Sequence, residues 1–345
     1  MSSSKKVFLF GAGGMGMAPL GIYLANMGFS VEAYDDFFRE PLRSQLEESG
    51  VQILNEPVPL KRPDLIIRSS AVSEDDPRLL PFRKLDLPIY RRGQFVSRFC
   101  RSKQVVAVVG SHGKTTTSGM LVWALDQVGF SFSYMVGGRF QDDLLPIGSF
   151  DEHSPWLVLE IDESDGTINE FEPHITLALN CDWDHVDQYT SPEHLKETFH
   201  ELFKRTKSKV MVPSAGELSD WAEQIIPGSY HTFNSPSEPA DFMMANQEAV
   251  ISAGHAIGVD LSKLDFSKFP GMERRQSLLF ESEKLTILED YAHHPVEIRA
   301  LLSSRRRQLP DHWMHVLFQP HRFTRTKALA ASFAEELSEV DDLQF

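Results

Sequence analysis

The sequence predicts an α/β protein built on parallel sheets. Two glycine-rich turns, at 11–16 and 110–113, each follow a short apolar run, at 7–10 and 105–109. Helix-like segments alternate with the apolar runs along most of the chain, which is the pattern of parallel sheets. Ligands bind at the carboxyl ends of strands in such sheets, and that is where these turns lie. We therefore expect two ligand-binding sheet edges.

The composition limits the class of protein. The chain has 345 residues, enough for two or three domains, and a formal net charge of -15 from 34 basic and 49 acidic residues. This charge disfavours nonspecific binding to nucleic acid or to anionic membranes. Two cysteines exclude a disulfide-rich scaffold and fit a reducing compartment. Since no run approaches the ~20 apolar residues of a membrane span, we expect a cytoplasmic protein with neither a nucleic-acid nor a membrane partner.

Residues 1–103 are expected to form the first domain. The expected elements are, in chain order, a strand at 7–10, a helix at 19–27, a strand at 30–34, a helix at 42–49 and a strand at 64–68. Gly28 and Gly50 follow the two helices, as glycine does at helix ends.

Residues 104–270 and 271–345 are expected to form a central and a third domain, with Pro270-Gly271 as the hinge. The expected central elements are strands at 105–109, 156–161 and 175–180 and a helix at 116–128. Residues 213–240 hold several Pro, Ser and Gly residues and are interpreted as loop-rich. The expected third-domain elements are strands at 285–288 and 314–318 and a helix at 296–307.

The second glycine-rich turn has the chemistry of a phosphate-binding loop. A helix N-terminus offers free N–H groups to a phosphate, a lysine adds a point charge, and a threonine hydroxyl can ligate Mg²⁺. The loop is a short form, because Val108 stands where the general motif has its first glycine. An ordinary turn before a helix is the alternative. The loop consists of Gly110, Ser111, His112, Gly113, Lys114, Thr115 and Thr116.

The first glycine-rich turn has the dinucleotide-binding pattern, with Asp35 about 20 residues further on at the end of the next strand. Taken alone, the pattern favours NAD and an oxidoreductase. The glycines permit close approach to any nucleotide diphosphate, however, and a tight turn without a ligand is the third interpretation. The turn comprises Gly11, Gly13, Gly14, Met15 and Gly16.

Carboxylates and a histidine follow two central strands. Glu160 precedes the acidic cluster 162–165, and His185 lies within 182–187 beside three aspartates. Near Lys114, such groups are plausible Mg²⁺ ligands, although any single acid alone is more typical of a solvated loop. The predicted metal ligands are Thr115, Glu160 and His185.

Two polar clusters follow strands of the third domain. The first contains His293 and His294, and the second contains His321, Arg322 and Arg325. Their spacing is not that of a zinc finger. The arginines could hold a phosphate or carboxylate through paired hydrogen bonds, or could simply be surface residues.

These segments, in this order, resemble the Mur ligase family over nearly the whole chain. The matching segments are 11–17, 110–117, 160–166, 180–187, 270–275, 290–297 and 319–326. The resemblance implies a three-domain architecture with a Rossmann-like N-terminal domain, a central P-loop ATPase-like parallel sheet and a partial Rossmann-like C-terminal domain. Members' third domains normally continue past the position of Phe345, so we expect an incomplete third domain.

The resemblance implies an ATP- and Mg²⁺-dependent ligase of peptidoglycan synthesis. It would join the carboxylate of UDP-N-acetylmuramate to L-alanine through an acyl phosphate. Segments 162–165 and 319–322 favour this alanine-adding type over the type that attaches a recycled tripeptide. That tripeptide ligase, and a non-catalytic homologue that binds a nucleotide sugar, stay open. A monomer or weak homodimer is expected.

The resemblance also implies roles for individual residues. The implied catalytic residues are Lys114, Glu160, His185, His294, Arg322 and Arg325. ATP would contact the phosphate loop together with Asn246, Arg275 and Asp290. The nucleotide sugar would contact the first glycine-rich turn, Asp35, Ser69, Ser70 and His321. Phe242 and Met243 replace a His-Asn pair of the alanine-adding members, which bears on the adenine pocket.

Overall fold

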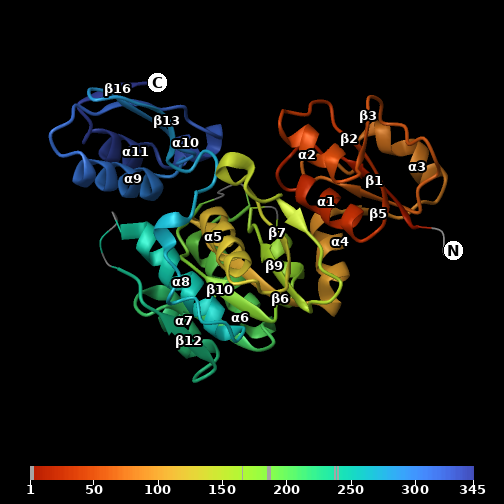
Figure 1. Cartoon of the computed structure of the whole chain (residues 1–345), viewed down its shortest axis with the longest axis horizontal. Coiled ribbons are helices and arrows are strands. Elements are labelled where there is room, and N and C mark those ends of the chain that lie inside the picture. The colour runs from red at the N-terminus through yellow and green to blue at the C-terminus, as the bar shows by residue number, and fades with distance from the viewer. Residues whose placement is uncertain (1–3, 165, 185–187, 237, 239–240) are drawn as a thin grey trace.

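The chain is arranged as three units in sequence order (Figure 1). The computed structural model describes residues 4–164, 166–184, 188–236, 238 and 241–345. We call residues up to 103 the first unit, 104–270 the central unit and 271–345 the third unit. These divisions stay a prediction. In Figure 1 the first and third units lie on either side of the top of the central unit.

The first unit contains a five-stranded, all-parallel sheet of order β3-β2-β1-β4-β5, the order of the first five strands of a doubly wound sheet. The strands are β1 (Lys6–Phe10), β2 (Ser30–Tyr34), β3 (Gln52–Leu54), β4 (Leu65–Arg68) and β5 (Ile89–Arg91). The helices are α1 (Ala18–Asn26), α2 (Leu42–Glu48), α3 (Leu80–Lys84) and α4 (Arg92–Phe99). The short 3₁₀ turns are η1 (Pro77–Leu79) and η2 (Cys100–Ser102).

The central unit contains a seven-stranded sheet of order β12-β11-β10-β6-β9-β7-β8, parallel except for the β7–β8 pair. The strands are β6 (Gln104–Val109), β7 (Ser133–Met135), β8 (Gly148–Ser149), β9 (Trp156–Glu160), β10 (Ile175–Ala178), β11 (Lys209–Pro213) and β12 (Tyr230–Phe233). The helices are α5 (Lys114–Gln127), α6 (Pro192–Arg205), α7 (Glu217–Ile225) and α8 (Phe242–Ala256). The 3₁₀ turns are η3 (Gln141–Asp143), η4 (Thr167–Glu170) and η6 (Phe266–Lys268).

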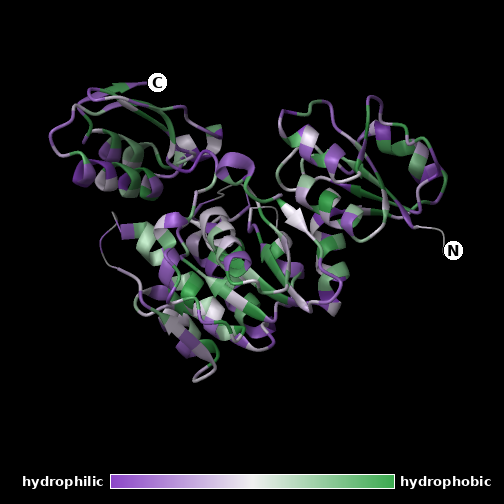
Figure 2. Ribbon diagram, in the orientation of Figure 1, coloured by the Kyte–Doolittle hydropathy of each residue, from purple (hydrophilic) through white to green (hydrophobic). Residues whose placement is uncertain are grey.

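Helix α5 is the internal helix of the central unit. Every residue from Thr115 to Leu125 is buried, because α5 packs against the sheet on one side and against α8 on the other. A helix that is enclosed all round needs apolar or small residues on every face, and α5 supplies them. Figure 2 shows hydrophobic residues concentrated in the strands behind it. The phosphate loop therefore leads directly into a helix that is buried on all sides.

The third unit carries two separate two-stranded sheets. Strands β13 (Ser277–Glu281) and β14 (Thr286–Glu289) are antiparallel, whereas β15 (His315–Leu317) and β16 (Asp342–Gln344) are parallel. The helices are α9 (Pro295–Gln308), α10 (Phe323–Ala328) and α11 (Ala330–Leu337). A small core of Ile298, Phe318, Phe333 and Leu337 lies between them. Parallel pairing in this unit, among the residues described, is thus confined to β15 and β16.

The first and central units share one hydrophobic core, which extends from β1 and α1 to β6, α5 and β9. Their contact is close at Gly148 in β8, where an added Cβ would lie 2.5 Å from the carbonyl oxygen of Pro19 at the start of α1. Arg91 of the first unit also forms an ion pair with Glu170 of the central unit, with an N···O distance of 2.9 Å.

Most predicted elements are confirmed within one or two residues, and β2 has the predicted bounds. The interpretation of 213–240 as loop-rich missed one helix and one strand, because α7 and β12 lie there. Leu218, Trp221 and Ala222 are buried in α7 at helical spacing, and that apolar face outweighs the local Pro, Ser and Gly. Within the described residues, no helix has the length and apolarity needed to cross a bilayer.

We predict that Gly148→Ala destabilises the protein by about 1–3 kcal/mol, because the new methyl group meets a backbone oxygen that cannot move aside easily. Urea denaturation measures the effect. Gly14→Ala is the matched control, since an added Cβ there meets nothing within 4 Å. Equal midpoints for the two variants would contradict the close contact between the units.

Candidate active site

A cavity of about 660 Å³ lies where the central and third units meet. Its central wall includes the phosphate loop and α8, and its opposite wall comes from the hinge, β13, the segment after β14 and α9. Of the predicted nucleotide-binding residues, the lining includes His112, Gly113, Thr116, Asn246, Arg275 and Asp290. The structure thus brings together predicted residues that lie up to 178 positions apart, from His112 to Asp290.

The phosphate loop turns sharply between β6 and α5. Gly110 and Gly113 have φ angles of 145° and 78°, which side-chain-bearing residues rarely adopt. An added Cβ on Gly110 would also lie 3.2 Å from the backbone nitrogen and oxygen of Asn180. Both glycines are therefore required by the geometry of the loop.

The loop is held in place by the segment after β10. The side chain of Asn180 accepts a hydrogen bond from the backbone N–H of His112 at 2.8 Å and donates one to its carbonyl oxygen at 3.0 Å. The Ser111 hydroxyl donates to the carbonyl oxygen of Asp182 at 2.6 Å. These bonds fix the loop backbone and leave the His112 side chain free to face the third unit.

Lys114 opens α5, and its ammonium group is enclosed by acceptors. Its Nζ lies 2.5 Å from the carbonyl oxygen of Gly110 and 3.0 Å from Oε2 of Glu163. Burial alone would lower the pKa of Lys114, but the carboxylates of Glu163, Asp162 and Glu160 outweigh burial and raise it to about 12. The lysine is therefore a permanent cation at the base of the loop.

The side-chain oxygens of Thr115 and Glu160 lie next to each other near Lys114 and could ligate a metal ion. The Thr115 hydroxyl donates to Oε1 of Glu160 at 3.0 Å, and Oε2 of Glu160 accepts from Ser118 Oγ at 3.3 Å and from the N–H of Gly137 at 3.0 Å. Hydroxyl and carboxylate oxygens fit Mg²⁺, a hard cation. The described residues contain no cluster of three His, Cys, Asp or Glu that could hold a metal. The predicted ligand His185 lies outside the described residues.

The third unit contacts the phosphate loop through the start of α9. The rings of His294 and His112 lie 4.7 Å apart between centroids. His294 caps α9 by accepting a hydrogen bond at Nδ1 from the N–H of Val296 at 3.3 Å, whereas its buried Nε2 has no partner among the described residues. Burial, followed by the nearby His112, lowers the pKa of His294 to about 4. His294 is therefore neutral near pH 7 and has an N–H to offer beside the loop.

A buried ion pair also joins the two units. Arg325 of α10 donates from Nε and Nη2 to the two carboxylate oxygens of Asp184, at 2.6 and 2.8 Å. Both side chains are only 2% exposed. Arg325 is outside the cavity lining, so in this arrangement it serves the contact between units. Its remaining nitrogen, Nη1, is buried without a hydrogen-bond partner in the described part of the chain.

Two other predicted residues of the third unit lie outside the cavity lining. His321 and Arg322 are exposed, and the His321 ring packs edge-on against His293 at 6.0 Å. Their predicted contacts with substrate stay predictions.

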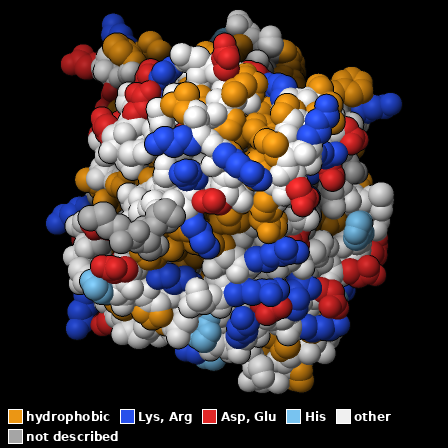
Figure 3. All heavy atoms as spheres, turned by 90° about the vertical axis from the view of Figure 1, so that its right-hand side faces the viewer, with side chains coloured by type: hydrophobic (Ala, Val, Ile, Leu, Met, Phe, Trp, Pro, Cys, Tyr) orange, Lys and Arg blue, Asp and Glu red, His pale blue; other side chains and the backbone are white. Residues whose placement is uncertain are grey.

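Apart from His321, the predicted nucleotide-sugar residues lie at the ends of β1, β2 and β4 in the first unit. Asp35 accepts hydrogen bonds from the N–H groups of Gly13, at 2.7 Å, and Phe37, at 3.2 Å, so it shapes the turn. The Ser69 side chain lies against Gly11, where an added Cβ would be 2.9 Å away, and Ser70 is exposed. The exposed face of the first unit mixes basic, acidic and hydrophobic side chains (Figure 3).

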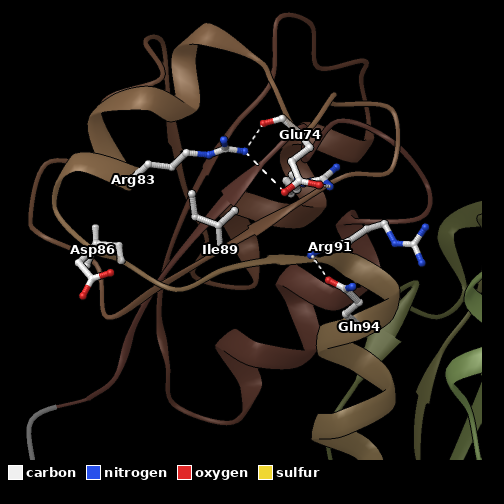
Figure 4. A pocket seen from close by; sticks show the side chains of 8 residues that line it. Glu74, Arg83, Asp86, Ile89, Arg91 and Gln94 are labelled. Carbon is white, nitrogen blue, oxygen red and sulfur yellow. Dashed lines mark hydrogen bonds and ion pairs between the residues drawn. The ribbon is translucent and has the colours of Figure 1, made fainter.

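A second cavity, of about 590 Å³, lies in the first unit beside β4, α3, β5 and α4 (Figure 4). It is lined by three arginines, but each already has a carboxylate partner. Arg68 and Arg83 face Glu74 at 3.8 Å, and Arg91 pairs with Glu170. We therefore assign the chemistry to the cavity at the phosphate loop.

Comparison with known families agrees with this geometry. The Mur ligase middle domain matches residues 108–257, and the catalytic domain of the Mur ligase family matches residues 7–104. The chain belongs to the Mur ligase family. The predicted family is confirmed.

Among curated Mur ligases, the UDP-N-acetylmuramate–L-alanine ligase of Lawsonia intracellularis is 28% identical over 380 residues, covering 99% of this chain and 83% of the relative. The enzyme of the same name from Desulforamulus reducens is 27% identical over 389 residues, covering 98% and 81%.

Solved Mur ligase structures confirm the predicted α/β fold class. The UDP-N-acetylmuramate-alanine ligase of Thermotoga maritima superposes with a TM-score of 0.77 at 23% identity, covering 99% of this chain and 90% of that one. The murein peptide ligase of Psychrobacter arcticus gives 0.75 at 21% identity, covering 99% and 84%.

Four residues of this Mur ligase hold the site together in ways that sequence reasoning did not predict: Asn180, Glu163, Asp184 and Glu297. The sequence places Glu163 and Asp184 only within the acidic clusters interpreted as plausible Mg²⁺ ligands. For two of the four residues the sequence contained a feature that could have indicated the role. Glu163 lies in the acidic cluster after β9, and Glu297 follows His294 by three residues, the spacing of a capping box. Nothing local pairs Asp184 with Arg325.

We predict that the free energy of unfolding falls as the pH drops from 6.5 towards 4. In this range His294 binds a proton in the unfolded state but stays neutral in the folded state, because its folded-state pKa is lowered to about 4. The slope from this residue reaches about 1.4 kcal/mol per pH unit. His294→Asn keeps a capping side chain and should flatten that part of the curve. Urea midpoints measured across the range give the comparison, and parallel curves for the two proteins would rule out a buried neutral His294.

We predict that Arg325→Ala destabilises the protein by about 3–5 kcal/mol, since the buried Asp184 carboxylate loses both hydrogen bonds from the guanidinium. The double variant Arg325→Met, Asp184→Leu should recover most of the loss, because it removes both charges. Chemical denaturation tests both. If the single variant is as stable as the wild type, the buried pair does not form.

Proposed function

We propose that this chain is an ATP-dependent ligase that joins the carboxylate of UDP-N-acetylmuramate to the amino group of L-alanine, in peptidoglycan synthesis. One observation carries the proposal: the phosphate loop meets the third unit at a shared cavity, which His112, Gly113 and Thr116 of the loop line. The His112 ring also lies 4.7 Å from the ring of His294 in the third unit. The names of the curated relatives, which match nearly the whole chain, support both substrates.

The proposed chemistry has two steps. A carboxylate oxygen of the muramate attacks the γ-phosphorus of ATP, the bond from that phosphorus to the β-phosphate oxygen breaks, and ADP and an acyl phosphate result. The amine then attacks the acyl carbon, phosphate leaves with the carboxylate oxygen, and the nitrogen gives up a proton. Since water would hydrolyse the intermediate, the reaction needs an enclosed site.

The residues of the loop fit the first step. The glycine turn and the start of α5 offer N–H groups to the phosphates, and the Lys114 cation balances charge that develops on them. Asn246 and Asp290 line the adjoining cavity, where they can contact the rest of the nucleotide. The neutral His294 can donate from Nε2 to a phosphate oxygen.

Mg²⁺ fits beside the loop. Thr115 and Glu160 would hold it through oxygen atoms, with His185 as the further ligand that the family resemblance implies. When bound, the ion neutralises phosphate charge. The hydrogen bonds from Ser118 and Gly137 orient the Glu160 carboxylate for this role.

The test is ADP release from ATP in the presence of UDP-N-acetylmuramate and MgCl₂, followed by a coupled assay. We expect release to depend on L-alanine and to fall about 100- to 1000-fold in Lys114→Ala. A parallel assay replaces L-alanine with the tripeptide L-alanyl-γ-D-glutamyl-meso-diaminopimelate. Preference for the tripeptide would contradict the alanine assignment, and no amine-dependent ADP at all would contradict the ligase function.

We predict that Glu160→Gln raises the Mg²⁺ concentration required for half-maximal activity by about 10- to 100-fold, because a carboxylate ligand becomes a weaker amide. Glu172→Gln is the control, since Glu172 is half exposed and pairs with Lys207. Magnesium titrations of the two variants provide the measurement. An unchanged requirement in Glu160→Gln would remove Glu160 from the metal site.

A further inference from the structure

Glu297 uses its two carboxylate oxygens for two different purposes. Oε2 accepts hydrogen bonds from the N–H groups of His293, at 2.9 Å, and His294, at 3.3 Å, and so caps the start of α9. Oε1 faces the central unit and lies 3.3 Å from Nδ1 of His112 in the phosphate loop. The Glu297 side chain is 13% exposed, and its cap on α9 limits the positions that it can adopt.

The other side of His112 belongs to the central unit. Its Nε2 lies 3.5 Å from Oδ2 of Asp182, so the imidazole sits between a carboxylate of each unit. The His112 backbone is fixed independently by Asn180. The side chain is therefore the part of the loop whose position responds to Glu297. Burial would raise the pKa of Glu297, but the neighbouring His112, whose Nδ1 lies 3.3 Å away, and the charges of His293 and Arg275 outweigh burial and lower it.

We propose that Glu297 is a positioning residue, which acts through His112 to couple the docking of the third unit to the nucleotide affinity of the phosphate loop. Because Oε2 is committed to the helix cap, Oε1 loses its partner if His112 is removed, and a buried carboxylate oxygen is then left unpaired. Conversely, without the Glu297 charge the imidazole keeps its ring contact with His294 but loses the charged neighbour of its Nδ1 atom.

This inference goes beyond the proposed function and rests on it only in taking a nucleotide as the ligand of the loop. It predicts that Glu297 and His112 affect nucleotide binding together, so that changing either side chain removes the same contribution. Glu297→Gln retains an oxygen that can cap α9 but removes the negative charge facing His112. A role in capping alone would therefore leave nucleotide binding by this variant unchanged.

The experiment is a double-mutant cycle on the affinity for ADP in the presence of MgCl₂, measured by calorimetry on the whole chain. We expect Glu297→Gln and His112→Gln each to weaken binding about tenfold, and the double variant to bind no more weakly than either. Such non-additivity is a coupling of about 1.4 kcal/mol, the equivalent of a tenfold change. Glu339→Gln, an equal charge change at an exposed position of the same unit, should bind as the wild type does.

The other possible results of the ADP-binding measurements each contradict either the coupling or the proposed function. Wild-type affinity in Glu297→Gln, or losses that add to about a hundredfold in the double variant, overturn the coupling and leave the proposed function intact. Absence of ADP binding by the wild-type chain overturns the proposed function, and the coupling with it. Steady-state kinetics give a second measurement: the coupling predicts a rise in the KM for ATP, whereas a purely structural defect lowers the amount of active protein and hence the apparent kcat.

Discussion

The buried ion pair between Arg325 and Asp184 is the contact on which the arrangement of the site depends. Two fully desolvated charges cost free energy unless they meet in good geometry, and here both guanidinium–carboxylate bonds form. The pair holds the third unit against the central one, so the start of α9 can reach the phosphate loop. His112, His294 and Glu297 then share one polar junction between units that are joined in sequence only at the hinge.

The charged and hydroxyl groups at the start of α5 have internal partners in this structure. The Lys114 ammonium group forms a hydrogen-bonded ion pair with Glu163, and the Thr115 hydroxyl donates a hydrogen bond to Glu160. Binding of a nucleotide and a metal ion would exchange these internal partners for phosphate oxygens and the ion. A buried cation that already has acceptors around it stays charged and oriented, which favours transition-state stabilisation without large rearrangement. Glu160 is thus a partner of the Thr115 hydroxyl in this structure and, under the proposed function, would also be a ligand of Mg²⁺.

The predictable part of the structure is the part with local signals. β6, the glycine turn and α5 follow from sequence pattern, since Val105 to Val109 form an apolar β-branched run and Gly113 begins a helix. The three-residue strands β3 and β5 are too short for a periodic signal, and α7 is hidden in a segment of Pro, Ser and Gly. The contact of Arg325 with Asp184 joins positions 141 residues apart, and that of His112 with Glu297 depends on how whole units dock. The residue types in the sequence predict the chemistry of the site. Which side chains contact one another depends on tertiary packing, which local sequence patterns do not encode.

The central claim is that the phosphate loop activates a carboxylate for amide formation. Its most direct test is the fate of an ¹⁸O label in the muramate carboxylate during turnover with ATP and L-alanine, followed by mass spectrometry of the phosphate released. If an acyl phosphate forms, the carboxylate oxygen that attacked phosphorus leaves with the phosphate, and each phosphate carries one atom of the label. Unlabelled phosphate released in step with amide formation would contradict the account.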